Sequence, residues 1–293
     1  MMYELIQVAD NTFYMDCPSK VGFYKTGTNE VIIIDSGNDK DAGKKVKKIL
    51  DSMNWELKAI YNTHSHADHI GGNKYLTELT GCKVYANGID RSFTKYPVLE
   101  PSFLYGGYPL KELKNKFLMA GESDPEPITE NTLPIGLNMT ELPGHSYDMI
   151  GFKTSDNVYF IADSLSGTET LQKYQINYLY DVEAYIDTLE KLKSEKCLCF
   201  IPSHAPVTDD ISALAQLNID NTLKIADRIK DILTEPMTFE ELLSVIFESY
   251  NITMNLQQRM LIGCTVKSYL SYLNNQKQIN FYFSENKMIW NRS

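Results

Sequence analysis

The feature that most constrains the fold is a regular alternation of strand-like and helix-like segments in the first third of the chain. Apolar runs rich in β-branched residues occupy 31–35, 57–62 and 83–87. Between them, 39–53 and 73–80 carry apolar residues at helical spacing. This β-α-β-α-β order predicts an α/β domain, in which loops at the strand ends carry the chemistry.

A dense group of metal-ligand side chains follows the second of these strands. The motif THSHADH places His64, His66, Asp68 and His69 within six consecutive positions. In an extended segment alternate residues point the same way, so the first three share a side, while a bend brings His69 round. Neutral imidazole and carboxylate are ligands of Zn²⁺, and a catalytic zinc site keeps one position for water. The motif therefore predicts a metal site.

Three more polar residues end apolar segments further along the chain. His145, Asp163 and His204 stand in ELPGHS, YFIADSL and CFIPSHAP. A single histidine is more often structural than a ligand. Here, however, each residue stands where a strand would deliver it to one edge of the domain. We expect all three to join the cluster formed by THSHADH.

The pattern HxHxDH followed by distant His, Asp and His resembles the signature of the metallo-β-lactamase fold superfamily of dinuclear hydrolases, in a glyoxalase II-like branch. The resemblance covers about residues 3–206 and implies an α/β fold, a four-layer αβ/βα sandwich with two divalent metal ions at one edge. In this arrangement, His64, His66 and His145 would hold the first ion, Asp68, His69 and His204 the second, and Asp163 would bridge them.

The resemblance also suggests a role for Asp35, in the segment IIIDSG. It would orient a ligand histidine from behind, and the alternative is a carboxylate that only ends a strand. Imidazole and carboxylate ligands do not choose between zinc, iron and manganese. Zinc is the first expectation, with iron or manganese as alternatives.

The implied activity is hydrolysis by a metal-bridged hydroxide, with Asp68 as the catalytic residue that orients it. A thioester, lactone or related ester is the first substrate class, and a phosphodiester, cleaved as by a single-strand endoribonuclease, is the alternative. Asp163 argues against β-lactamase activity, because antibiotic-cleaving members usually lack an aspartate at the bridging position. His66 argues against the O₂-reducing flavodiiron branch, which carries a carboxylate there. An iron-dependent sulfur dioxygenase and a binding protein with a relic site are the other hypotheses.

Residues 88–133 interrupt the alternation with an aromatic insertion punctuated by Pro and Gly. A segment of this length in a compact domain is usually a lid or an arm. As a lid, it could cover an acyl group with Tyr96, Phe103, Tyr105 or Tyr108. The alternative is a subdomain that packs on the core or on a second copy in a homodimer.

After the catalytic domain predicted for 1–206, residues 207–293 favour helices. Segments 211–233 and 255–278 have helical patterns, Thr238 and Glu241 form a capping box, and a hairpin pattern surrounds the turn SENK. This order is similar to a winged-helix module. The region contains 8 Lys/Arg and 10 Asp/Glu, and the whole chain has a net charge of −10. A nucleic-acid partner is therefore the minority hypothesis, and a packing or dimerisation role is favoured.

Composition and patterning place the expected activity in the cytoplasm, with a small-molecule substrate. The five cysteines lack CxxC spacing and suit reduced thiols. The N-terminal segment has no basic region followed by an apolar one, and no run approaches the roughly 18 apolar residues of a membrane span. We therefore expect no membrane attachment.

Overall fold

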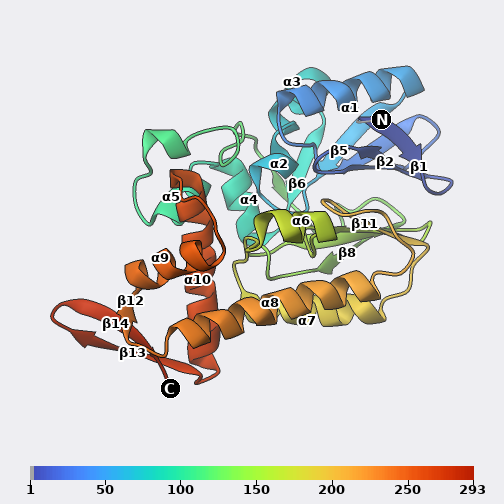
Figure 1. The fold of residues 1–293 in the computed structure, drawn as a ribbon. Helices are drawn as coiled ribbons and strands as arrows, with labels where there is room; N and C mark the ends of the chain where they lie inside the picture. Colours follow the sequence, from blue (N-terminus) through green and yellow to red (C-terminus); the bar gives the residue numbers. More distant parts are fainter. Residues whose placement is uncertain (1–2) are drawn as a thin grey trace.

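The computed structural model describes residues 3–293 and contains two β-sheets packed face to face (Figure 1). The first sheet has seven strands in chain order: β1 (Glu4–Gln7), β2 (Thr12–Asp16), β3 (Val21–Lys25), β4 (Glu30–Ile34), β5 (Glu56–Tyr61), β6 (Lys83–Ala86) and β7 (Glu126–Pro127). The second has the order β11-β10-β9-β8, from β8 (Leu137–Glu141), β9 (Ile150–Thr154), β10 (Val158–Ala162) and β11 (Cys199–Pro202).

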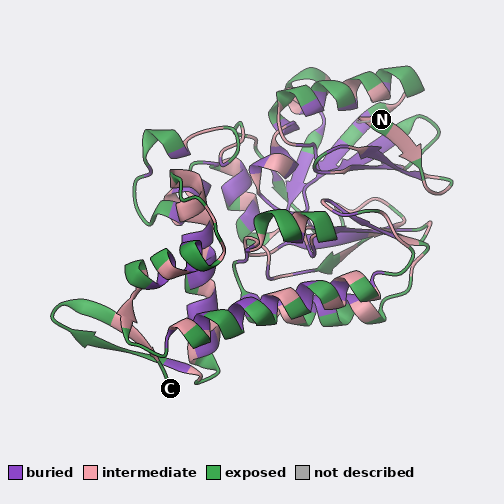
Figure 2. Cartoon of the chain, viewed as in Figure 1, coloured by how far each residue is buried: buried purple, intermediate pink, exposed green. Residues whose placement is uncertain are grey.

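Helices cover the outer face of each sheet. Helices α1 (Lys40–Met53) and α3 (Asn73–Thr80) lie over the first sheet, and α7 (Val182–Ser194) and α8 (Ser212–Ile232) lie over the second (Figure 1). Both sheets are largely buried, whereas the helices expose their outer faces (Figure 2). The predicted four-layer αβ/βα sandwich is confirmed.

Strand β4 shows why an uninterrupted apolar run occurs in the first sheet. Val31 and Ile33 pack with the core beneath α1 and α3, whereas Ile32 and Ile34 pack with residues of the second sheet. A strand buried on both faces has no polar side, so its sequence does not alternate. Its parallel neighbour β5 then delivers THSHADH to the same edge of the sheet.

Local capping determines where the first crossover helix begins and ends. The Asp39 side chain accepts hydrogen bonds from the backbone N–H groups of Asp41 and Ala42. Asn54 ends the helix in the left-handed conformation, with φ 54°. The helix predicted for 39–53 is therefore confirmed, with Asp39 as its cap.

The insertion contains three short helices: α4 (Gly88–Lys95), α5 (Leu99–Tyr105) and the 3₁₀ helix η1 (Lys111–Leu113). Leu104, Leu113 and Leu118 form a small core of their own. Met260 and Leu261, from α10 (Leu256–Asn275), pack against this core. The insertion is thus a helical subdomain in contact with the C-terminal region.

The C-terminal region combines helices with a small sheet. Helix α9 (Phe239–Ser249) begins at the predicted capping box of Thr238 and Glu241 and precedes α10. Strands β12 (Met237–Thr238), β13 (Ile279–Ser284) and β14 (Lys287–Arg292) pair in the order β12-β14-β13. One hydrophobic core runs from the second sheet through α7 and α8 into α9 and α10. The boundary at residue 206 and the likeness to a winged helix stay predictions.

Among residues 3–293, no helix combines the length and the apolar character that crossing a bilayer requires.

Candidate metal centre

The structure brings the predicted ligand residues together at one edge of the sandwich. His64 and His66 follow β5, and the short helix α2 (Ala67–Ile70) carries the next two. The others come from the loops that follow β8, β10 and β11. Potential ligand atoms converge within 4.8 Å in three overlapping groups: His64, His66 and His145; His64, His69 and Asp163; and Asp68, His69 and His204.

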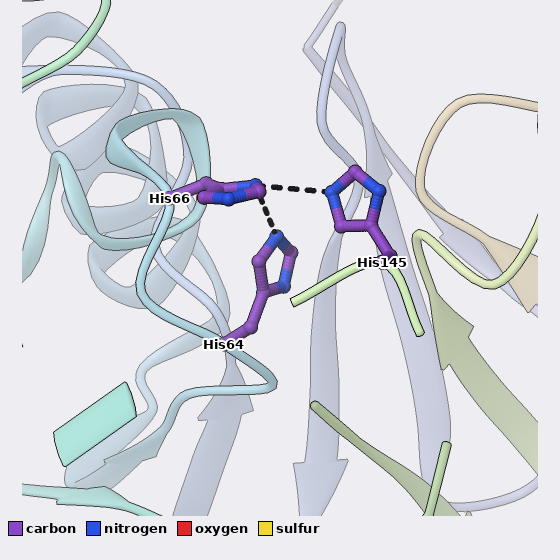
Figure 3. A group of neighbouring side chains, drawn as sticks. All are labelled: His64, His66 and His145. Carbon is purple, nitrogen blue, oxygen red and sulfur yellow. Dashed lines mark hydrogen bonds between the residues drawn. The ribbon is translucent and has the colours of Figure 1, made fainter. Parts of the chain in front are cut away.

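Three imidazoles form one side of this centre. His64 Nε2 lies 3.1 Å from His66 Nδ1, and His145 Nε2 lies 3.0 Å from the same atom. Figure 3 shows the three rings converging from two separate loops. Three ring nitrogens that face one another form the kind of donor set that holds a transition-metal ion.

Asp163 lies between the two sides of the centre. Its Oδ1 is 3.2 Å from His69 Nε2. Its Oδ2 is 3.4 Å from His145 Nε2 and 3.2 Å from His204 Nε2. Asp68 completes the second side, with Oδ2 3.2 Å from His204 Nε2. One carboxylate therefore reaches donors on both sides, as a bridging ligand must.

Two unpaired buried atoms show that the centre suits a cation. Within residues 3–293, His69 Nε2 and Asp163 Oδ1 are among the few buried side-chain atoms without a hydrogen-bond partner. Leaving such an atom unpaired costs about 1–3 kcal/mol. Both atoms are of the types that coordinate zinc, and they face each other. The donor set fits a divalent metal ion.

The charges of the centre lead to the same conclusion. Burial lowers the pKa of His145 to about 3 and that of His64 well below its usual value, so both rings are neutral. Burial opposes the charge on Asp163, but His204 and His69 outweigh it and hold the pKa of Asp163 well below its ordinary range. In turn, Asp163 outweighs the burial of His204 and raises its pKa to about 10. A divalent cation would supply this positive charge and leave the imidazoles neutral, the form that coordinates metals.

Asp35 holds a predicted ligand histidine in place, as the resemblance implied. Its Oδ2 lies 2.8 Å from His69 Nδ1 and accepts a hydrogen bond of 2.7 Å from the Thr63 hydroxyl. Its Oδ1 accepts a hydrogen bond of 2.8 Å from the Thr63 backbone N–H. Asp35 has φ 61°, an unusual conformation for a residue other than glycine. With Nδ1 engaged, Nε2 of His69 is directed at the centre.

A second buried aspartate, Asp90 in α4, connects the two loops that carry the imidazoles. Its Oδ1 accepts hydrogen bonds from the backbone N–H and the hydroxyl of Ser65, at 2.9 and 2.6 Å. Its Oδ2 accepts from the Asp148 N–H at 2.9 Å and from the Ser146 hydroxyl at 3.2 Å. Sequence reasoning missed this residue, although it follows the third strand as other site residues follow theirs.

The β2–β3 turn supports the opposite side of the centre and was also missed. His204 Nδ1 donates to the Pro18 carbonyl at 2.7 Å, and the Ser19 hydroxyl donates to Asp68 Oδ2 at the same distance. In the sequence this segment shows only the polar and proline composition of a turn, so no signal marks it as part of the site.

Comparison with known proteins identifies the family. The model of the Metallo-beta-lactamase superfamily matches residues 14–204, which include every predicted ligand. The chain belongs to the metallo-β-lactamase superfamily.

Curated relatives in this superfamily are hydrolases. The chain is 31% identical over 93 residues to a hydroxyacylglutathione hydrolase of Methylococcus capsulatus, covering 31% of this chain and 32% of the relative. It is 24% identical over 188 residues to an atrochrysone carboxyl ACP thioesterase of Aspergillus aculeatus, covering 64% of this chain and 50% of the relative. The aligned segments thus span half or less of these relatives.

A solved superfamily structure reproduces the whole fold. A metallo-beta-lactamase family protein of Thermus thermophilus superimposes with a TM-score of 0.70, 16% identity and coverage of 94% of each chain. A beta-lactamase domain protein of Burkholderia ambifaria gives a TM-score of 0.73 and 13% identity, covering all of this chain and 94% of the other. The likeness therefore extends through the C-terminal region.

Two cavities open onto the metal centre of this superfamily member. The first, which we call the α10 cavity, has a volume of about 440 Å³ and reaches the centre at His145 and Asp163. The first turns of α10 form part of its wall. The second, the lysine cavity, has a volume of about 870 Å³ and reaches the centre at Asp68 and His204. Lys20, Lys116 and Lys173 line it.

The aromatic residues expected to cover a substrate lie elsewhere, which corrects that expectation. Tyr96, Tyr105 and Tyr108 are exposed and line neither cavity. The Lys114 ammonium donates a hydrogen bond to the Tyr108 hydroxyl and also lies over the Tyr108 ring as a cation–π contact. Phe103 packs against Tyr147 and Tyr180. The insertion instead contributes Lys116 and Phe117 to the lysine cavity.

Proposed function

We propose that this protein hydrolyses a thioester, lactone or related ester with two divalent metal ions, zinc in the first instance. The observation that carries the proposal is the position of Asp163, whose two oxygens face donors on both sides of the centre. His64, His66 and His145 would hold one ion and Asp68, His69 and His204 the other, with Asp163 shared.

The two ions would lower the pKa of a shared water, which makes hydroxide available near neutral pH. The chain itself supplies orientation and a proton acceptor. Asp68 is the carboxylate of the centre that faces solvent, with its side chain 40% exposed against 10% for Asp163. The Ser19 hydroxyl fixes one of its oxygens. Asp68 therefore lies where it can orient the nucleophile and accept its proton, the catalytic role that we assign to it.

The walls of the α10 cavity support an acyl substrate. Beyond His145 and Asp163, the lining combines aliphatic side chains such as Ile176, Leu179 and Ile262 with tyrosines and several polar side chains. Small-molecule sites are typically apolar cavities with a few polar groups, of about 300–1,000 Å³. The names of the relatives, a thioesterase and hydroxyacylglutathione hydrolases, agree with this substrate class.

A phosphodiester is the second candidate, because three lysines line the lysine cavity beside Asp68 and His204. Two of these lysines already have partners. Lys20 donates to the Ala205 carbonyl at 2.7 Å, and Lys116 lies 3.1 Å from Asp39 Oδ2. The Asp39 carboxylate thus offsets the Lys116 charge and the Ala205 carbonyl holds Lys20 against the chain, which leaves fewer free cations for a phosphodiester and favours the acyl substrate.

Turnover of a thioester, a lactone and an aryl phosphodiester by metal-loaded protein tests the proposal. Wild type should cleave the acyl substrates, and Asp163→Asn should lose both this activity and bound metal. Asp187→Asn, on the exposed face of α7, is the matched control and should behave as wild type. Cleavage of the phosphodiester alone would overturn the acyl assignment, and full activity of Asp163→Asn would overturn the metal assignment.

A further inference from the structure

The α10 cavity joins the metal centre to the C-terminal region. At the centre it is bounded by His145 and Asp163, and across from them by Gln258, Leu261 and Ile262 of α10. A substrate group in this cavity would therefore contact a helix outside the segment that the family model matches. Recognition of that group would therefore involve residues that the family model does not cover.

Gln258 is the unusual residue of this wall. Its Oε1 is buried and has no hydrogen-bond partner within residues 3–293. Only three other side-chain atoms in that range share this condition, and two of them, His69 Nε2 and Asp163 Oδ1, belong to the metal centre. The remaining one, on Tyr269, lies in the main core. Apart from the residues of the centre itself, Gln258 thus carries the unpaired acceptor that lines a cavity leading to the centre.

The backbone beneath Gln258 is held firmly. Asn255 caps α10, and its side chain accepts a hydrogen bond of 3.0 Å from the Gln258 backbone N–H. This cap fixes the first turn of the helix and so the point from which the Gln258 side chain extends. An acceptor that is buried and unpaired is satisfied when a ligand donor arrives.

We propose that the α10 cavity binds a mainly apolar acyl group that carries one hydrogen-bond donor, a hydroxyl or an amide N–H, and that Gln258 Oε1 accepts this hydrogen bond. The inference rests on the proposed function, because the acyl carbon must reach the metal centre. Gln258 then acts as a specificity-determining residue, while the neighbouring aliphatic side chains contact the rest of the acyl group.

Paired substrates test this assignment. Metal-loaded protein is given thioesters with a hydroxyl or amide N–H at successive acyl positions, each beside its analogue without the donor. In wild type, kcat/KM at one position should favour the donor by about 10-fold, the ratio supplied by one neutral hydrogen bond. Gln258→Met should remove this preference by slowing only the donor-bearing substrate. Gln276→Met, at the exposed end of the same helix, is the matched control and should keep the preference.

A binding measurement separates failure of this inference from failure of the proposed function. The carboxylic acids that correspond to the acyl groups are titrated calorimetrically into the same proteins, and the donor-bearing acid should bind more tightly only when Gln258 is present. If wild type turns over the acyl substrates and Gln258→Met lowers kcat/KM equally for both members of each pair, the role of Gln258 is overturned and the proposed function stands. If no acyl substrate is turned over, the proposed function fails. If, in addition, wild type and Gln258→Met bind the donor-bearing acid and its analogue equally well, the cavity assignment fails too.

Discussion

Replacing Asp90 with asparagine should loosen both imidazole-bearing loops at once. The carboxylate accepts four hydrogen bonds, and two of the donors are the backbone N–H groups of Ser65 and Asp148, each 2.9 Å away. These N–H groups lie on opposite oxygens. Whichever way the asparagine amide is turned, its NH₂ group therefore faces one of them. That N–H loses its acceptor within a buried site.

The size of the effect follows from these contacts. Losing a hydrogen bond to a charged group costs about 1.5–3 kcal/mol of unfolding free energy, and Asp90 is only 1% exposed, so water cannot take the place of the carboxylate. Changes to residues that orient metal ligands typically weaken metal binding by about 10–100-fold. We expect both effects, because Ser65 lies between His64 and His66, and Ser146 follows His145.

Two assays check this prediction. Urea unfolding gives the free energy, and competition with a chromophoric chelator gives the zinc affinity, while the visible spectrum of the Co²⁺-substituted protein reports ligand geometry. Asp124→Asn, an exposed aspartate of the same insertion paired with Lys95, should change stability by less than about 1 kcal/mol and leave the spectrum unchanged. Wild-type zinc affinity and an unaltered Co²⁺ spectrum in Asp90→Asn would refute the reasoning.

Three further predictions follow from the packing and the charges. Gly22→Ala should destabilise the fold by about 1–3 kcal/mol, because the new Cβ would lie 2.5 Å from a Phe160 ring atom of the facing sheet. In the control, Gly107→Ala, the new Cβ would meet its nearest neighbour at 4.0 Å, and stability measured by urea unfolding should hardly change. Equal losses of stability in the two variants would contradict the packing. Burial raises the pKa of the Cys17 thiol from 9.0 to about 11, so the stabilisation of its neutral form is complete at low pH and is lost as the pH rises through 11. Since this leaves about 100-fold less thiolate at pH 8, iodoacetamide should modify Cys17 about 100-fold more slowly than an unperturbed thiol, and peptide mapping that finds rapid labelling would disprove it. Chelation of metal should lower the melting temperature, because Asp68 and Asp163 lose their counter-charge, and excess zinc should restore it. A melting temperature that chelator does not change would be evidence against the metal centre.

Local patterns in the sequence predict the α/β alternation and the ligand cluster, whereas the four-layer sandwich was implied by the family resemblance. Buried strands are recognisable as apolar runs, and a polar residue directly after such a run lies at the sheet edge, as Asp163 does after β10. The family resemblance, rather than this pattern, implied that Asp35 orients a ligand histidine, and the structure places its Oδ2 2.8 Å from His69 Nδ1.

The supporting residues could not be predicted because their roles depend on contacts distant in the sequence. Asp90 reaches Ser65 across 25 positions and Asp148 across 58. Gln258 belongs to a helix whose pattern indicates packing but not which cavity it faces. The aromatic composition of the insertion suggested a lid over a bound acyl group for a related reason. In the structure, long-range packing places Phe103 against Tyr147 instead.

The central claim is that two metal ions share Asp163 in this centre. Calorimetric titration of metal-free protein with Zn²⁺ tests it most directly. Wild type should bind two ions per chain, and Asp163→Asn should bind fewer or bind them far more weakly. Binding of a single ion by wild type, or unchanged binding of two ions by Asp163→Asn, would contradict the account.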